Sequence, residues 1–149
     1  MKKTKLVLHS ILSILFLINL AIQAQIEEIT EKFLYGNYNS ATNPFKYRLF
    51  VPENYDSTKN YPIVLTLHGA GETGNDNEIQ ISLNHIATCW ADSAFQSKHP
   101  CFIFSPQTPV YGWGYASVME MLDSLVNSYS IDTNRIYITG LSMGGYGTW

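Results

Sequence analysis

The segment that decides the fold is residues 135–149, which read RIYITGLSMGGYGTW. Its first five residues are a strand-like, β-branched run, and Gly140 to Gly144 directly after it match the pattern G-x-S-x-G. This pattern predicts a sharp turn from strand to helix with Ser142 at its apex, because glycines at both ends remove side chains that would collide. A tight turn that carries no chemistry is the alternative interpretation of this pattern taken alone.

A second segment has the same placement after a strand. Residues 61–67 are nearly continuous apolar sequence, typical of a strand covered on both faces, and lead into HGAG at 68–71. The carboxyl ends of parallel strands meet at one edge of a sheet, so both segments are expected there. We therefore predict that Ser142 is a nucleophile and that the backbone amides of Met143 and Ala70 form its oxyanion hole.

The histidines do not supply a base for this serine. His68 precedes Ser142 and lies in the predicted oxyanion loop, so a role in bracing that loop is favoured over proton transfer. His85 and His99 are interpreted as surface positions, and the carboxylates lack metal-ligand spacing. No metal or cofactor is predicted, and the missing acid and base are expected C-terminal to Trp149. The 149 residues alone are therefore expected to have little or no activity.

The loop after the apolar segment 101–105 supplies candidate binding residues. Gln107, Tyr111 and Trp113 are expected to line an acyl or sugar pocket, or equally to pack on the rim of the sheet. Gly71 is a further candidate for binding and the second choice, after Ala70, for the oxyanion donor.

The rest of the chain alternates strand and helix signals. Strands are predicted at 45–51, half exposed, and at 101–105, with a weaker edge-strand signal in 27–42. One helix is predicted at 81–95 and a second behind a capping box formed by Ser117 and Glu120. The apolar stripe of the second helix is interpreted as core packing; it comprises Val118, Met121, Leu122, Leu125, Val126 and Tyr129. This alternation predicts an α/β fold with a mainly parallel, doubly wound sheet.

Residues 1–24 are predicted to be a signal peptide. Lys2, Lys3 and Lys5 precede an apolar stretch that ends at a small residue, Ala24. An uncleaved membrane anchor is the alternative, although the run is short for a spanning helix. The remaining chain, 25–149, is expected to be secreted or periplasmic without stable membrane association. Its six basic and twelve acidic residues give a formal net charge of −6, which disfavours nucleic acid as a partner.

The two cysteines would then lie in an oxidising compartment. A disulfide between Cys89 and Cys101 and two free thiols both stay open, because sequence spacing does not report the distance between Cα atoms. Neither cysteine is expected to carry the chemistry.

Five motifs taken together point to a family. They are YRLFVP at 47–52, LHGAGE at 67–72, SPQ at 105–107, DTNRIY at 132–137 and GLSMGG at 140–145. With these motifs the chain resembles, from residue 45 to its end, the α/β-hydrolase esterases of the phospholipase/carboxylesterase and carbohydrate-esterase type. That group is related to feruloyl esterases, polyhydroxybutyrate depolymerases and prolyl-oligopeptidase-like peptidases. The motifs are specific to the superfamily and not to a substrate.

The resemblance implies a function as well as a fold. Residues 25–149 would be the N-terminal portion of an α/β-hydrolase domain, truncated just after the turn at Ser142. The whole protein would be a secreted serine hydrolase that cleaves small or polysaccharide-linked carboxylic esters through an acyl-enzyme on Ser142. A prolyl-oligopeptidase-like serine peptidase and a non-catalytic binding protein on the same scaffold are the two alternatives. Of the Ser-Asp/Glu-His triad that the family implies, only the serine has a counterpart in this chain.

The signal-peptide interpretation predicts the N-terminus of the exported protein. When the gene is expressed in a secreting host, Edman sequencing of the exported protein should begin at Gln25, because cleavage follows Ala24. An exported or membrane-bound protein that still carries Lys2 and Lys3 would contradict this prediction and support the uncleaved anchor.

Overall fold

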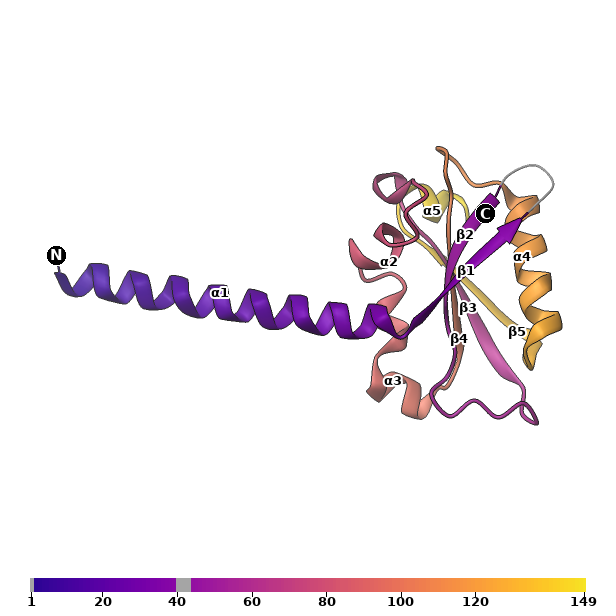
Figure 1. Cartoon of the computed structure of the whole chain (residues 1–149), viewed down its shortest axis with the longest axis horizontal. Coiled ribbons are helices and arrows are strands. Elements are labelled where there is room, and N and C mark those ends of the chain that lie inside the picture. Colours follow the sequence, from indigo (N-terminus) through magenta and orange to yellow (C-terminus); the bar gives the residue numbers. More distant parts are fainter. Residues whose placement is uncertain (1, 40–43) are drawn as a thin grey trace.

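The computed structural model describes residues 2–39 and 44–149, and within them a five-stranded sheet has the order β1-β2-β4-β3-β5 (Figure 1). The strands are β1 (Phe33–Asn39), β2 (Pro44–Phe50), β3 (Tyr61–Leu67), β4 (Phe102–Gln107) and β5 (Ile131–Gly140). Strand β3 pairs in parallel with β4 and with β5, whereas β2 pairs antiparallel with β1 and with β4. The parallel part of the sheet therefore consists of the three strands whose ends carry the predicted site.

Helices cover both faces of the sheet, as a doubly wound fold requires (Figure 1). Helix α4 (Tyr115–Ser128) packs on one face, and α2 (Ile79–Ser82) and α3 (Ser93–Lys98) lie on the other. Three short elements complete the set: the 3-10 turns η1 (Ala70–Glu72) and η2 (Thr88–Ala91), and helix α5 (Met143–Tyr146). The predicted α/β fold is confirmed, with one apolar cluster on each face of the sheet.

The apolar stripe of α4 is core packing, as predicted. Val118, Met121, Leu122 and Leu125 are all buried against the sheet. The predicted capping box is wrong, because the helix begins two residues before Ser117. Gly114 is its N-cap, and the carbonyl of Gly114 accepts the first helical hydrogen bond from the Val118 amide at 3.2 Å.

The predicted helix at 81–95 is also wrong, because side-chain oxygens interrupt it. The region forms α2, η2 and the start of α3, separated by turns. Asn84 accepts a hydrogen bond from the Ile86 amide at 2.9 Å, and Asp92 accepts two from the first turn of α3 at 3.0 Å each. Such local side-chain bonds to the backbone compete with a continuous helix.

Strand β2 is less exposed than its alternating sequence suggests. Arg48 is only 2% exposed, and its guanidinium carbon lies 3.5 Å from the centre of the Tyr35 ring. Arg48 Nη2 donates a hydrogen bond to the Thr30 carbonyl at 3.1 Å. The prediction that the strand at 45–51 is half exposed is therefore wrong at Arg48, because β1 and the end of the preceding helix cover this side chain. The weak prediction of an edge strand within 27–42 is confirmed by β1, which lies at the edge of the sheet.

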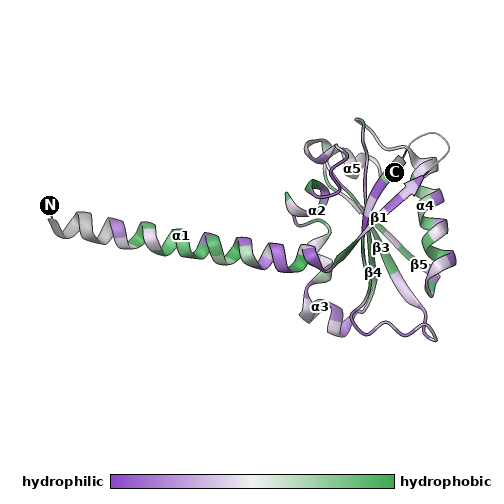
Figure 2. Cartoon of the chain, in the orientation of Figure 1, coloured by the Kyte–Doolittle hydropathy of each residue, from purple (hydrophilic) through white to green (hydrophobic). Residues whose placement is uncertain are grey.

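Helix α1 (Lys2–Glu31) projects from the domain as a single long helix (Figure 1). Apolar residues are concentrated along its middle and in the central strands (Figure 2). Residues 9–31 are long and apolar enough to cross a membrane, by length and composition. The last turn packs on the domain through Ile29, and Thr30 is buried. The cleavage point predicted after Ala24 lies within α1.

Both cysteines are free in the structure. Cys89 is exposed, whereas Cys101 is buried just before β4 and accepts a hydrogen bond from Gln96 at 3.3 Å. The sequence leaves open a disulfide or two free thiols, and the structure has the two free thiols.

Candidate active site

Ser142 lies at the apex of a strained turn between β5 and α5. Its φ of 50° and ψ of −111° lie outside the regions that side chains favour, and among residues 2–39 and 44–149 only Asn77 is another non-glycine residue with positive φ. Such strain persists only where the surroundings fix the backbone, and it is often found at functional sites. The side chain of Ser142 is exposed to solvent.

Two glycines allow this turn to form, as the sequence predicts. A Cβ atom on Gly140 would collide with the backbone of Gly144, and one on Gly144 would collide with the carbonyl of Leu67 at the end of β3. The Leu141 amide also donates a hydrogen bond to the Leu67 carbonyl at 3.0 Å. The ends of β3 and β5 are therefore held against each other directly beneath Ser142.

The loop after β3 lies beside the serine. A Cβ atom placed on Gly69 would be 3.4 Å from the Leu141 carbonyl oxygen and 3.7 Å from Ser142 Cβ. In the described part of the chain, none of the hydrogen bonds uses the amide of Ala70 or of Met143. The structure thus brings Ser142, Ala70 and Met143 to one edge of the sheet, with both amides unpartnered. Their role as oxyanion donors stays a prediction.

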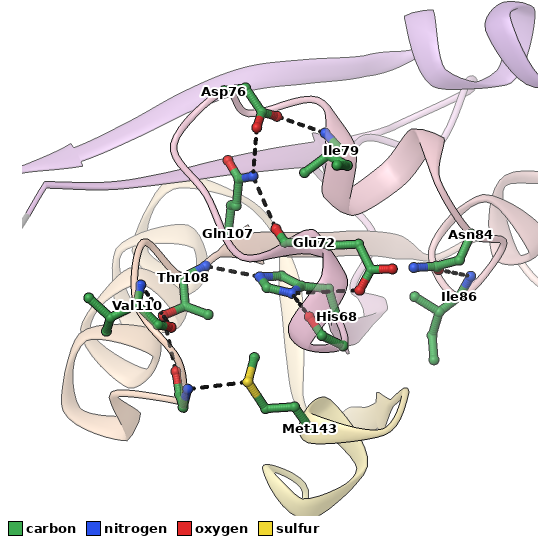
Figure 3. A network of polar contacts seen from close by, with 12 residues as sticks. His68, Glu72, Asp76, Ile79, Asn84, Ile86, Gln107, Thr108, Val110 and Met143 are labelled. Atoms are coloured by element: carbon green, nitrogen blue, oxygen red, sulfur yellow. Dashed lines mark hydrogen bonds and ion pairs between the residues drawn. The ribbon is translucent and has the colours of Figure 1, made fainter.

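His68 braces the loop, as expected, and is fully buried. Its Nε2 atom accepts a hydrogen bond from the Thr108 amide at 3.0 Å, so the neutral ring carries its proton on Nδ1 (Figure 3). That proton is donated to the Gly69 carbonyl, 2.6 Å from Nδ1. Burial lowers the pKa of His68, which keeps the ring neutral at neutral pH and preserves this arrangement. His85 and His99 lie on the surface, as predicted.

The brace fixes the direction of one peptide group. The Gly69 carbonyl points at the imidazole and also accepts a hydrogen bond from the Glu72 amide at 3.3 Å. Since the described chain contains no cis peptide, the N–H of Ala70 points opposite to that carbonyl. His68 therefore directs the Ala70 amide away from the imidazole. Protonation of Nε2 would set its N–H group against the N–H group of Thr108 and so break this hydrogen bond.

The predicted binding residues differ in their surroundings. Gln107 is buried at the end of β4, and Trp113 is half-buried with its ring 4.7 Å from that of His68. Tyr111 is 82% exposed at the tip of the loop, and Gly71 is exposed with open space around it. The loop reaches the serine turn through Gly112, whose amide donates to Met143 Sδ at 3.2 Å. Contacts of these residues with substrate remain predictions.

Two residues of the network carry no sequence signal. Thr108 contacts His68 through its backbone amide. Any residue except proline provides such an amide, so the identity of the side chain does not predict the contact. Glu72 is 6% exposed, and its Oε2 atom lies 4.0 Å from His68 Nδ1 (Figure 3). An acidic residue is usually expected at the surface, so the sequence does not predict that Glu72 is buried.

The geometry of the serine turn predicts the outcome of two matched substitutions. Gly144→Ala should lower the free energy of unfolding by about 1–3 kcal/mol or more, because its methyl group meets a backbone carbonyl that has no room to move. Gly145→Ala should change it by less than about 1 kcal/mol, because its methyl group would be in ordinary contact, 3.5 Å from the Gly140 oxygen. Urea unfolding checks both variants, and equal destabilisation would contradict the described packing.

Comparisons with known proteins find relatives that match part of this chain. No family model matches the chain. It is 29% identical to poly(3-hydroxyalkanoate) depolymerase C of Paucimonas lemoignei over 74% of this chain and 28% of that protein. It is also 29% identical to the bifunctional acetylxylan esterase/xylanase XynS20E of Neocallimastix patriciarum, over 68% of this chain and 15% of that protein. The chain thus spans less than a third of these curated relatives.

Two solved structures that are similar to this chain are also named as esterases. A thermostable esterase is 40% identical, with a TM-score of 0.78, over 81% of this chain and 37% of that one. The feruloyl esterase module of Clostridium thermocellum, 18% identical with a TM-score of 0.60, covers 78% of this chain and 47% of that one and supports the fold alone. The chain is therefore similar to esterases in sequence and structure, and the five strands of its described residues have the α/β-hydrolase fold.

Proposed function

We propose that the chain is the N-terminal portion of a serine hydrolase that cleaves carboxylic esters. The observation that carries this proposal is the strained, exposed Ser142 beside two unpartnered backbone amides, those of Ala70 and Met143. The first N–H groups of any helix lack a partner within it, and Ala70 and Met143 are the first residues of η1 and α5. Their position beside a strained, exposed serine is what favours chemistry over a plain tight turn. The similarity to the 40% identical esterase supports the same reaction class.

The proposed reaction forms an acyl-enzyme on Ser142. Its Oγ atom attacks the ester carbonyl carbon while a base removes the hydroxyl proton, and the carbonyl oxygen becomes an oxyanion. The amides of Ala70 and Met143 donate hydrogen bonds to that oxygen. The C–O bond to the alcohol then breaks, the alcohol leaves with the proton, and water hydrolyses the acyl-serine. We place the base, a histidine, and its orienting Asp or Glu C-terminal to Trp149.

The proposed substrates are esters of small acids, either free or linked to polysaccharide. This choice is supported by the relative that is named for acetylxylan. We further propose that residues 1–24 are a signal peptide and that the protein acts outside the cytoplasm. The apolar stretch in α1 is compatible with that role.

Replacement of the proposed nucleophile is the direct test. In the full-length protein, Ser142→Ala should reduce hydrolysis of p-nitrophenyl acetate by about 10⁴-fold or more, because no acyl-enzyme can form. The exposed Ser128 on α4 supplies the matched control, and Ser128→Ala should keep full activity. Retention of hydrolysis by Ser142→Ala, with folding verified by circular dichroism, would show that the nucleophile is assigned wrongly.

A further inference from the structure

Gln107 is a buried polar residue that the proposed reaction does not use. It is the last residue of β4 and is 1% exposed, so its carboxamide has almost no access to solvent. A buried amide is costly unless its donors and acceptor are paired, so its partners show what the side chain serves.

All of its partners lie on the loop that follows His68. Gln107 Oε1 accepts a hydrogen bond from the Asn77 amide at 2.7 Å. Its Nε2 donates to the Glu72 carbonyl at 3.2 Å and to Asp76 Oδ2 at 3.3 Å (Figure 3). The carboxamide therefore joins both ends of the segment 72–77 to one another and to β4.

The next residue completes the attachment of this loop to β4. The Thr108 amide donates to His68 Nε2, and its carbonyl accepts from the Gly74 amide at 3.0 Å. Ala70 lies between the anchored residues His68 and Glu72, so the position of its amide depends on both attachments. Strain in the loop is consistent with tight fixation, since Asn77 is held at a φ of 63°.

We infer that Gln107 is a positioning residue for the Ala70 amide, a role that replaces the substrate contact expected from the sequence, because its buried carboxamide is already occupied. This inference rests on the proposed function, in which that amide stabilises the oxyanion. Loss of the carboxamide frees the Glu72 carbonyl, two residues after Ala70, and the amide of Asn77. The His68 brace on the Gly69 carbonyl remains, but the Ala70 amide loses the support on its C-terminal side and is held less precisely. Imprecise placement of this donor reduces stabilisation of the transition state more than binding of the substrate.

The chain contains a matched control at the opposite end of β4. Gln96 is also buried, and its Nε2 donates to the Trp90 carbonyl at 2.8 Å and to the Cys101 carbonyl at 3.2 Å. Its Oε1 accepts from the Cys101 amide at 3.1 Å. Like Gln107, Gln96 accepts from one backbone amide and donates to backbone carbonyl oxygen, but the connection that it holds carries none of the proposed catalytic groups.

The experiment compares Gln107→Leu with Gln96→Leu in the full-length protein, using p-nitrophenyl acetate and thermal unfolding. Both variants should lower Tm, because each leaves buried backbone groups without partners. Gln107→Leu should lower kcat about 10- to 100-fold with KM within about twofold, since misplacement of one donor affects the transition state. Gln96→Leu should keep the wild-type kcat. Gln107→Asn, which keeps an uncharged carboxamide but withdraws it by one methylene from its partners, should lower kcat in the same direction and serves if Gln107→Leu does not fold.

Each other result overturns the inference. A raised KM with unchanged kcat in the Gln107 variants would make this residue a substrate contact. Wild-type kcat in both leucine variants, with similar losses of Tm, would make its role purely structural. The Ser142→Ala variant separates this inference from the proposed function. If Ser142→Ala keeps its activity, the proposed reaction itself is wrong; if it loses activity, the Gln107 variants test only the role of Gln107.

Discussion

The hydrogen bond from the Thr108 amide to His68 Nε2 is the contact on which the site depends. It joins the end of β4 to the residue after β3, and it selects the tautomer in which Nδ1 carries the proton. That proton holds the Gly69 carbonyl and so sets the direction of the Ala70 amide. Burial lowers the pKa of His68 and keeps the ring neutral, which preserves the lone pair that accepts from Thr108.

The serine turn is held by a different kind of constraint. Gly140 and Gly144 let the turn approach the end of β3 more closely than any side chain permits, and the Leu141–Leu67 hydrogen bond fixes that approach. Directional hydrogen bonds on one side and steric contact on the other therefore place two backbone amides beside one strained serine. The buried carboxamide of Gln107 adds a third support, farther along the same loop.

The sequence predicts those parts of the molecule that depend on local chain properties. The turn at Ser142, the buried strand β3, the stripe on α4 and the bracing role of His68 all follow from periodicity, glycine placement and order along the chain. Two of the three errors share a cause, which is side-chain contact with distant residues or with the local backbone. The third, the capping box at Ser117 and Glu120, is wrong because α4 begins earlier, behind Gly114. Asn84 and Asp92 interrupt the helix expected at 81–95, and Arg48 is buried by the Thr30 carbonyl and the Tyr35 ring. The hydrogen-bond partners of Gln107 cannot be predicted from the sequence either, because they lie about thirty residues before it in the chain.

We propose that the amides of Ala70 and Met143 together donate hydrogen bonds to an oxygen of the group bound to Ser142. The most direct test is a crystal structure of the full-length protein after reaction with a p-nitrophenyl alkylphosphonate, which leaves a tetrahedral phosphorus on a nucleophilic serine. The claim predicts phosphorus on Ser142 Oγ and one phosphoryl oxygen about 2.7–3.1 Å from both amide nitrogens. A phosphonylated Ser142 whose oxygens point away from Ala70, or phosphorus on another residue, would contradict it.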